Sequence, residues 1–111
     1  MKYPLVFYVE SLSGTKAGEA RGPVVRILES KRDDPGILAH EMVHVRQWFR
    51  TLGIHSFLYL LSDDYKLRAE VEAYREQALH CPDDRRPLFA KFLSERYDLS
   101  ITPEAALELL K

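Results

Sequence analysis

Two histidines and a glutamate stand close together in the segment His40-Glu41-Met42-Val43-His44. On a helix, residues four apart lie on the same face, so both imidazoles can point at one spot. Glu41 follows the first histidine, so its carboxylate can lie close to the point at which both imidazoles are directed. This is the H-E-x-x-H arrangement, in which the histidines bind zinc and the glutamate acts as general base on a water molecule. A chain of this length contains the string by accident roughly once in several hundred cases, so the segment predicts a zinc site.

A catalytic zinc site usually has three protein ligands and leaves the fourth position for water. In the metzincin pattern, a glycine follows the second histidine after three residues, and a third histidine follows three residues later. This chain has Gln47 and Arg50 at those positions, so the metzincin class is excluded. The remaining histidines, His55 and His80, do not stand at a recognised zinc spacing.

Two glutamates, Glu70 and Glu72, are candidates for the third ligand. Either follows His44 at a separation that leaves room for a turn and a returning helix. At about 100° per residue, Glu70 lies roughly 70° from the middle of the apolar stripe of its helix, and Glu72 roughly 130°. Glu70 also has Leu67 and Tyr74 beside it, whereas the neighbours of Glu72 are charged. A ligand must point into the domain, so Glu70 is the predicted third ligand and Glu72 the alternative.

The sequence before this motif predicts strands. Residues 3–9 are rich in aromatic and β-branched side chains, which is typical of a strand. Residues 11–22 combine glycines with small polar residues, which indicates a loop or a wide hairpin connection. Val24–Leu28 is the second predicted strand. Pro23 at its start predicts that this strand lies at the edge of the sheet, because proline lacks the amide donor that a central strand needs.

The rest of the chain predicts helices. An Asp34 cap and Pro35 begin a helix that runs to about Leu52, with Gly53 as its C-cap. This helix carries the H-E-x-x-H string and has little polar surface, so it is expected to lie at the buried centre of the domain. Residues 54–61 are apolar and indicate a short helix or a packed loop. Further helices are predicted over residues 64–79, 87–97 and 103–110, so the fold class is α+β with a small N-terminal sheet.

The length of 111 residues suits one domain with one core, predicted to span residues 1–111. The net charge of −1 gives no indication of nucleic acid or an anionic membrane as a partner. The single cysteine, Cys81, excludes an intrachain disulfide and suits a reducing compartment. The apolar run near the N-terminus is too short to span a membrane, and no cleavage site follows it. We therefore expect a cytoplasmic protein, and the sequence leaves its oligomeric state open.

The stretches Ile-Leu-Ala-His-Glu-Met-Val-His-Val-Arg-Gln (residues 37–47) and Glu-Val-Glu-Ala-Tyr (residues 70–74) resemble the gluzincin class of zinc metallopeptidases. The chain is most similar to the smallest members, the minigluzincins, and to short proteins of phage and prophage genomes. This resemblance covers residues 23–74. It implies a minimal zincin-like fold and one zinc ion per chain, held by His40, His44 and Glu70. It also implies that Glu41 acts as the general base in the hydrolysis of a peptide or protein substrate by a metalloendopeptidase.

The chain departs from the gluzincin pattern at one position. The class often has an aspartate four residues after the glutamate ligand, where it holds one histidine, and this chain has Tyr74 there. The tyrosine hydroxyl is expected either to take over that contact or to point at the substrate. The class often uses a tyrosine or histidine to stabilise the oxyanion, for which Tyr65, Tyr74, His80 and Tyr97 are the candidates. Val24–Leu28 resembles the strand that binds an extended substrate in this class by backbone pairing.

Two other functions remain compatible with the sequence. One is a protein of the same fold that holds zinc but has lost useful turnover, or that serves as a regulator of a single partner. The other is a helical interaction module in which the motif is accidental. The first predicts zinc without hydrolysis, and the second predicts no zinc and a stability that a chelator does not change.

Overall fold

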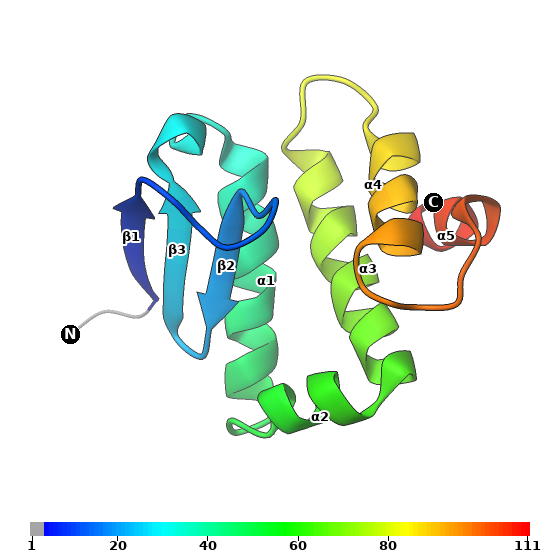
Figure 1. Cartoon of the computed structure of the whole chain (residues 1–111), viewed down its shortest axis with the longest axis horizontal. Coiled ribbons are helices and arrows are strands. Elements are labelled where there is room, and N and C mark those ends of the chain that lie inside the picture. Colours follow the sequence, from blue (N-terminus) through cyan, green and yellow to red (C-terminus); the bar gives the residue numbers. More distant parts are fainter. Residues whose placement is uncertain (1–3) are drawn as a thin grey trace.

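The computed structural model describes residues 4–111, and it has the α+β class that the sequence predicted. Tyr3, the predicted start of the first strand, is followed directly by Pro4 and lies outside the described residues. Within them, three strands and one 3₁₀ turn, Glu29–Lys31, come first, and five α-helices follow (Figure 1). The strands are β1 (Leu5–Val9), β2 (Gly18–Arg21) and β3 (Val24–Leu28). The helices are α1 (Pro35–Arg50), α2 (His55–Leu61), α3 (Asp63–Leu79), α4 (Arg86–Glu95) and α5 (Pro103–Leu110).

The prediction that Val24–Leu28 forms an edge strand is wrong. The strand order is β1-β3-β2, with β1 parallel and β2 antiparallel to the central β3. Pro23 precedes the strand, so its missing N–H lies in the turn, and its carbonyl still accepts a hydrogen bond from the amide of Leu5 at 3.0 Å. A proline at this position therefore costs the β-ladder nothing.

Strand β2 lies inside the segment predicted as a loop or hairpin connection. Its residues, Gly-Glu-Ala-Arg, include no β-branched or aromatic side chain, so local preference gives little indication of a strand. The strand forms because the chain turns back at Gly22, whose φ of +58° suits glycine, and then pairs with β3. This pairing places β2 at the edge of the sheet next to α1 (Figure 1).

Three helices begin at a residue whose side chain accepts a hydrogen bond from a backbone amide of the first turn. Asp34 accepts from the amide of Gly36 at 2.9 Å, Ser62 accepts from Tyr65 and Thr102 accepts from Ala105. The helix ends differ slightly from prediction. Helix α1 ends at Arg50, two residues early, and α4 covers residues 86–95, so that Tyr97 follows it. The segment 54–61, for which the sequence left two alternatives, forms the short helix α2.

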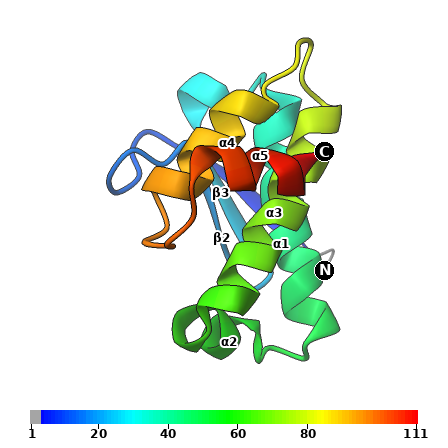
Figure 2. The same ribbon diagram turned by 90° about the vertical axis from the view of Figure 1, so that its right-hand side faces the viewer.

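The apolar side chains form two separate clusters, one on each side of the α1–α3 pair. The first cluster joins the sheet to α1 through Val25, Ile27, Ile37 and Val45. The second joins α3 to α4 and α5 through Tyr74, Phe89, Ala90, Leu93, Ala106 and Leu110. Helix α1 packs on the sheet and on α3, as expected for the central helix (Figures 1 and 2). The interface between α1 and α3 thus lies between the two clusters. No helix among residues 4–111 is long and apolar enough to cross a membrane.

Candidate metal centre

Two histidines and one glutamate meet at the α1–α3 interface. The Nε2 atoms of His40 and His44, both on α1, are 3.3 Å apart. On α3, Glu70 places Oε1 3.1 Å from Nε2 of His40 and Oε2 3.3 Å from Nε2 of His44. None of the three side chains exposes more than 11% of its surface. The structure therefore brings together the three residues that the sequence predicted as ligands, in an arrangement able to hold a metal ion.

The separations between the donor atoms suit a small tetrahedral cation. Zinc binds histidine nitrogen and carboxylate oxygen at about 2.0–2.2 Å, which places tetrahedral ligands roughly 3.4 Å apart. The two Nε2 atoms are 3.3 Å apart, and the Glu70 carboxylate meets His40 with Oε1 at 3.1 Å and His44 with Oε2 at 3.3 Å. With one donor atom taken from each residue, the three atoms all lie within 4.8 Å of one another. Two imidazoles and one carboxylate are also a donor set that zinc prefers. The three residues are therefore able to hold a metal ion such as zinc.

Gln47 sets the tautomer of His44. Its Nε2 donates to the carbonyl of Ala69 at 3.1 Å and to Oε1 of Glu72 at 2.9 Å, which determines the orientation of the amide. Its Oε1 therefore faces Nδ1 of His44 at 2.9 Å and accepts a hydrogen bond from it. When the ring is neutral, this contact favours the proton on Nδ1 and leaves Nε2 as the nitrogen that can bind a metal once it has given up its own proton.

Gln77 holds His40 in the same way. Its Oε1 lies 2.9 Å from Nδ1 of His40, so the Nε2 of this ring also faces the common centre and is the nitrogen available to a metal. Neither glutamine belongs to the motif that predicted the metal ligands. The only indication in the sequence was spacing: Gln47 stands three residues after His44, and Gln77 lies seven residues after Glu70 on the same helix face.

Small side chains on α3 allow the ligands to meet. Ala73 stands between Glu70 and Gln77 on the face toward α1, and Ala69 contributes a carbonyl to the same interface. Both alanines are buried, with exposures of 0% and 4%. Larger residues at these positions would separate the two helices and move Glu70 away from the histidines.

The electrostatics of the site depend on the pairing of His44 with Glu70. Burial alone would raise the pKa of the Glu70 carboxyl, but the charge of His44 and hydrogen bonds to both histidines hold that pKa well below its usual range. Burial would lower the pKa of His44, but the Glu70 carboxylate outweighs this effect and raises it to about 9. In the metal-free protein, His44 is therefore protonated at neutral pH and neutralises Glu70. A cation at the centre competes with this proton.

Glu41, the predicted general base, lies beside the centre and is not one of the three residues grouped there. It is buried, and burial raises the pKa of its carboxyl, an effect that both histidines oppose. The backbone of β2 passes close to it: a Cβ on Gly18 would meet Cγ of Glu41 at 3.3 Å and Cγ2 of Ile37 at 3.0 Å. The absence of a side chain at Gly18 therefore lets the edge strand approach Glu41.

Tyr59 on α2 is a further residue of the site, and the sequence analysis did not consider it. Its hydroxyl donates a 2.5 Å hydrogen bond to Oε2 of Glu70, and its ring lies edge-on to His44 with centroids 6.4 Å apart. Burial and the nearby Glu70 carboxylate raise the pKa of the hydroxyl. The sequence did hold an indication, because His55 and Tyr59 are four residues apart in an otherwise apolar run.

Tyr74 does not make the expected contact with a histidine nitrogen among the hydrogen bonds of residues 4–111. Its hydroxyl pairs with the hydroxyl of Tyr97 at 2.6 Å. Its ring packs edge-on against His40, with centroids 4.4 Å apart, and stacks on Phe89. Tyr74 thus supports His40 by packing, while Gln77 makes the polar contact.

The other predicted candidates lie farther from the ligands. The hydroxyl of Tyr65 bonds to Nδ1 of His55, and His80 lies 3.5 Å from Glu76 on the surface of α3. Glu72, the alternative third ligand, is half exposed and accepts hydrogen bonds from Gln47 and Arg50. Its position is therefore behind the centre, where it orients the amide that holds His44.

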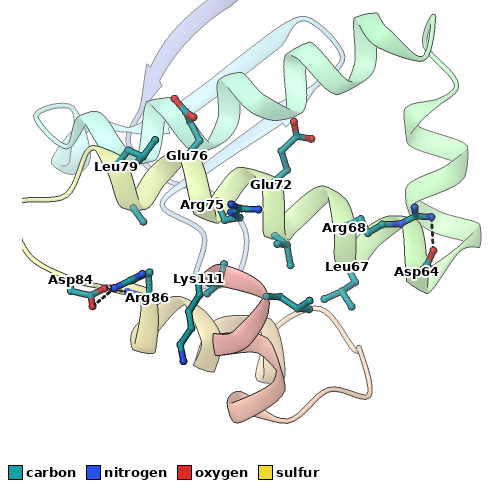
Figure 3. A pocket seen from close by; sticks show the side chains of 14 residues that line it. Asp64, Leu67, Arg68, Glu72, Arg75, Glu76, Leu79, Asp84, Arg86 and Lys111 are labelled. Carbon is teal, nitrogen blue, oxygen red and sulfur yellow. Dashed lines mark hydrogen bonds and ion pairs between the residues drawn. The ribbon is translucent and has the colours of Figure 1, made fainter.

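A groove between α3 and α5 lies apart from this centre (Figure 3). Its floor is apolar, and its rim carries charged side chains that pair with one another, such as Arg68 with Asp64 and Arg86 with Asp84. None of the three candidate ligands lines it. The groove is therefore separate from the candidate metal centre.

Comparisons of the chain with protein-family models, with curated proteins and with solved structures found no match. The geometry of the site is therefore the basis of the functional argument.

Proposed function

We propose that this protein is a zinc-dependent metallopeptidase of the gluzincin type. The observation that supports this proposal most is the convergence of His40, His44 and Glu70, whose donor atoms lie within 4.8 Å of one another, with Glu41 next to them. Both histidines present Nε2 because amide oxygens hold Nδ1. A site with three protein ligands leaves one position for water, as hydrolytic zinc sites do.

When bound, zinc would act as a Lewis acid toward a water molecule and the carbonyl of the scissile bond. Glu41 accepts the proton of the attacking water and donates it to the leaving amine. Its burial suits this task, because a carboxylate with a raised pKa holds a proton more firmly than an exposed one. Among the tyrosines of the described residues, Tyr59 has the hydroxyl that lies closest to the ligands, because it donates to Glu70. Once Glu70 binds a metal, that hydroxyl proton would become available to an oxyanion.

The substrate on this proposal is an extended peptide. The strand that the resemblance assigned to substrate binding, Val24–Leu28, is central and has neighbours on both sides. That role moves to β2, which is an edge strand and passes next to Glu41 at Gly18. An edge strand offers backbone donors and acceptors that an extended peptide can pair with.

The experiment compares wild type with Glu41→Gln, using zinc content and the cleavage of a mixed peptide library followed by mass spectrometry. We expect about one zinc per chain in both proteins and cleavage only by wild type. Glu104→Gln, at an exposed position in the first turn of α5, is the matched control and should cleave normally. Turnover retained by Glu41→Gln would contradict the role of Glu41. Zinc without cleavage of any substrate by wild type would favour an inactive or single-partner regulatory protein.

A further inference from the structure

Helix α2 has its polar residues on the inside and its apolar residues on the outside. His55 and Tyr59 face the body of the protein, where they bond to Tyr65 and Glu70. The opposite side of the helix carries Phe57, Leu60 and Leu61. Together with the exposed apolar residues Leu52, Ile54 and Leu58 in or next to the helix, they form what we call the α2 apolar face. Phe57, Leu60 and Leu61 expose 68%, 79% and 82% of their surface. This pattern is the reverse of an ordinary surface helix.

The position of α2 makes this face accessible. The helix connects α1 to α3 at one end of the molecule, away from α4 and α5 (Figures 1 and 2). It packs on α3 and, less extensively, on α1. The core clusters of the described residues include none of its apolar side chains. The α2 apolar face therefore contributes nothing to the core of a single chain.

The size of the face is that of a protein interface. With about 200 Å² per residue, the size of an aromatic side chain, as an upper bound, the exposed fractions amount to at most roughly 800 Å². Monomeric proteins rarely expose an apolar patch above about 600 Å². A standard interface removes about 800 Å² from each partner, so the face matches one side of a stable dimer.

The charges around the face are complementary to those of a second copy. Residues 51–62 contain no Asp, Glu, Lys or Arg, so two such segments can meet without burying a charge. Arg50, which pairs with Glu72 in its own chain, precedes this segment, and Asp63 and Asp64 follow it, with Asp64 paired to Arg68. When two copies pair antiparallel about a twofold axis, the basic end of each segment lies next to the acidic end of the other. Parallel pairing would bring like charges together.

We propose that the protein self-associates through the α2 apolar face, with the α2 helices of two copies packed antiparallel about a twofold axis. The same acidic residues, Asp63 and Asp64, argue against an anionic membrane as the occupant, because they repel its surface. Self-association covers the outer side of α2. The inner side of the same helix carries Tyr59, whose hydroxyl donates to Glu70. The inference is independent of the proposed metallopeptidase activity.

The test is sedimentation equilibrium of the full chain from about 1 μM to about 1 mM, a range that covers ordinary dimer affinities. We compare wild type with Phe57→Asp and Leu60→Asp, both at exposed positions, with circular dichroism as the check on folding. Leu79→Asp is the matched control: Leu79 is 78% exposed and lines the α3–α5 groove (Figure 3). We expect wild type and Leu79→Asp to dimerise equally. Because symmetry places each substitution twice in the dimer, either α2 variant should weaken association by at least about 100-fold.

Three results would overturn the proposal. One is a wild type that stays monomeric over the whole range. Another is an equal loss of association in Leu79→Asp, which would show an unspecific effect of the added charge. The last is a monomeric wild type that sediments with neutral phosphatidylcholine vesicles while Phe57→Asp does not. In that case a lipid surface, and not a second copy, would cover the α2 apolar face.

Discussion

The amide oxygen of Gln77 lies 2.9 Å from Nδ1 of His40, where the gluzincin pattern led us to expect a side chain from position 74. Gln47 makes the same contact with His44, also at 2.9 Å. Both histidines are therefore held by neutral amides. A carboxylate in either position would make the ring a stronger electron donor toward a metal.

We expect Gln77→Leu to lower zinc affinity by about 10- to 100-fold, because His40 loses the partner that fixes its tautomer and orientation. Competition with a chelator of known affinity measures the effect. Gln77→Glu keeps an oxygen acceptor and should bind zinc at least as tightly as wild type. Equal affinities of wild type and Gln77→Leu would mean that the amide does not position the ring.

The ligand assignment predicts which glutamate controls metal content. Glu70→Ala and His44→Ala should lose the zinc that purifies with wild type, because two remaining donors hold it poorly. Glu72→Ala should retain about one zinc per chain, since Glu72 only accepts hydrogen bonds from Gln47 and Arg50. Metal analysis by mass spectrometry decides between them. If only Glu72→Ala lost its zinc, Glu72 and not Glu70 would be the third ligand.

Zinc should stabilise the fold, because the polar α1–α3 interface separates the two apolar clusters. A ligand present at about 100 times its dissociation constant stabilises the native state by about 2.7 kcal/mol. Removal of the metal with a chelator should therefore lower the melting temperature by several degrees. Calorimetry with and without chelator measures this shift, and His44→Ala is the control in which the chelator should have no effect.

The His44–Glu70 pair predicts a pH dependence for the metal-free protein. The pKa of His44 is raised from 6.5 to about 9 in the folded state, so its contribution to stability is complete below pH 6.5 and is lost as pH rises toward 9. The pKa of Glu70 is lowered, so its contribution is present above 4.5 and is lost in more acidic solution. Urea unfolding across this range measures the free energy of unfolding. Subtracting the pH profile of the unfolding free energy of Glu70→Gln from that of wild type isolates the contribution of the His44–Glu70 pair. If this difference does not change above pH 6.5, the pair does not contribute as described.

Gly18→Ala tests the close approach of β2 to Glu41. The new Cβ would lie 3.0 Å from Ile37 and 3.3 Å from Glu41, so the side chain of the proposed general base must shift. We expect a loss of about 1–3 kcal/mol in stability and at least a tenfold lower kcat/KM, with zinc content unchanged. Gly14→Asn is the control, because the site is open and asparagine tolerates its positive φ. Unchanged kinetics in Gly18→Ala would exclude this contact from catalysis.

The features that depend on neighbouring residues in the chain were predictable from sequence. The cap at Asp34 and the spacing of His40 and His44 are local, so the helix that aligns both rings could be inferred directly. The choice of Glu70 over Glu72 also followed from helix geometry, because the angle from an apolar stripe determines which side chain turns inward. The exposures of the two side chains, 4% and 47%, agree with that choice.

Tertiary structure decided what depends on contacts between distant segments. Pairing with β3 makes Gly18–Arg21 a strand and places Val24–Leu28 at the centre of the sheet, which no local preference indicates. The partners of the histidine rings depend on how α1 and α3 pack. Gln77 reaches His40 across 37 residues of sequence, and Tyr59 reaches Glu70 from a different helix. The chain thus specifies the candidate ligands by local periodicity, whereas only the packing of α1, α2 and α3 determines which side chains orient them, because those contacts have no fixed sequence spacing.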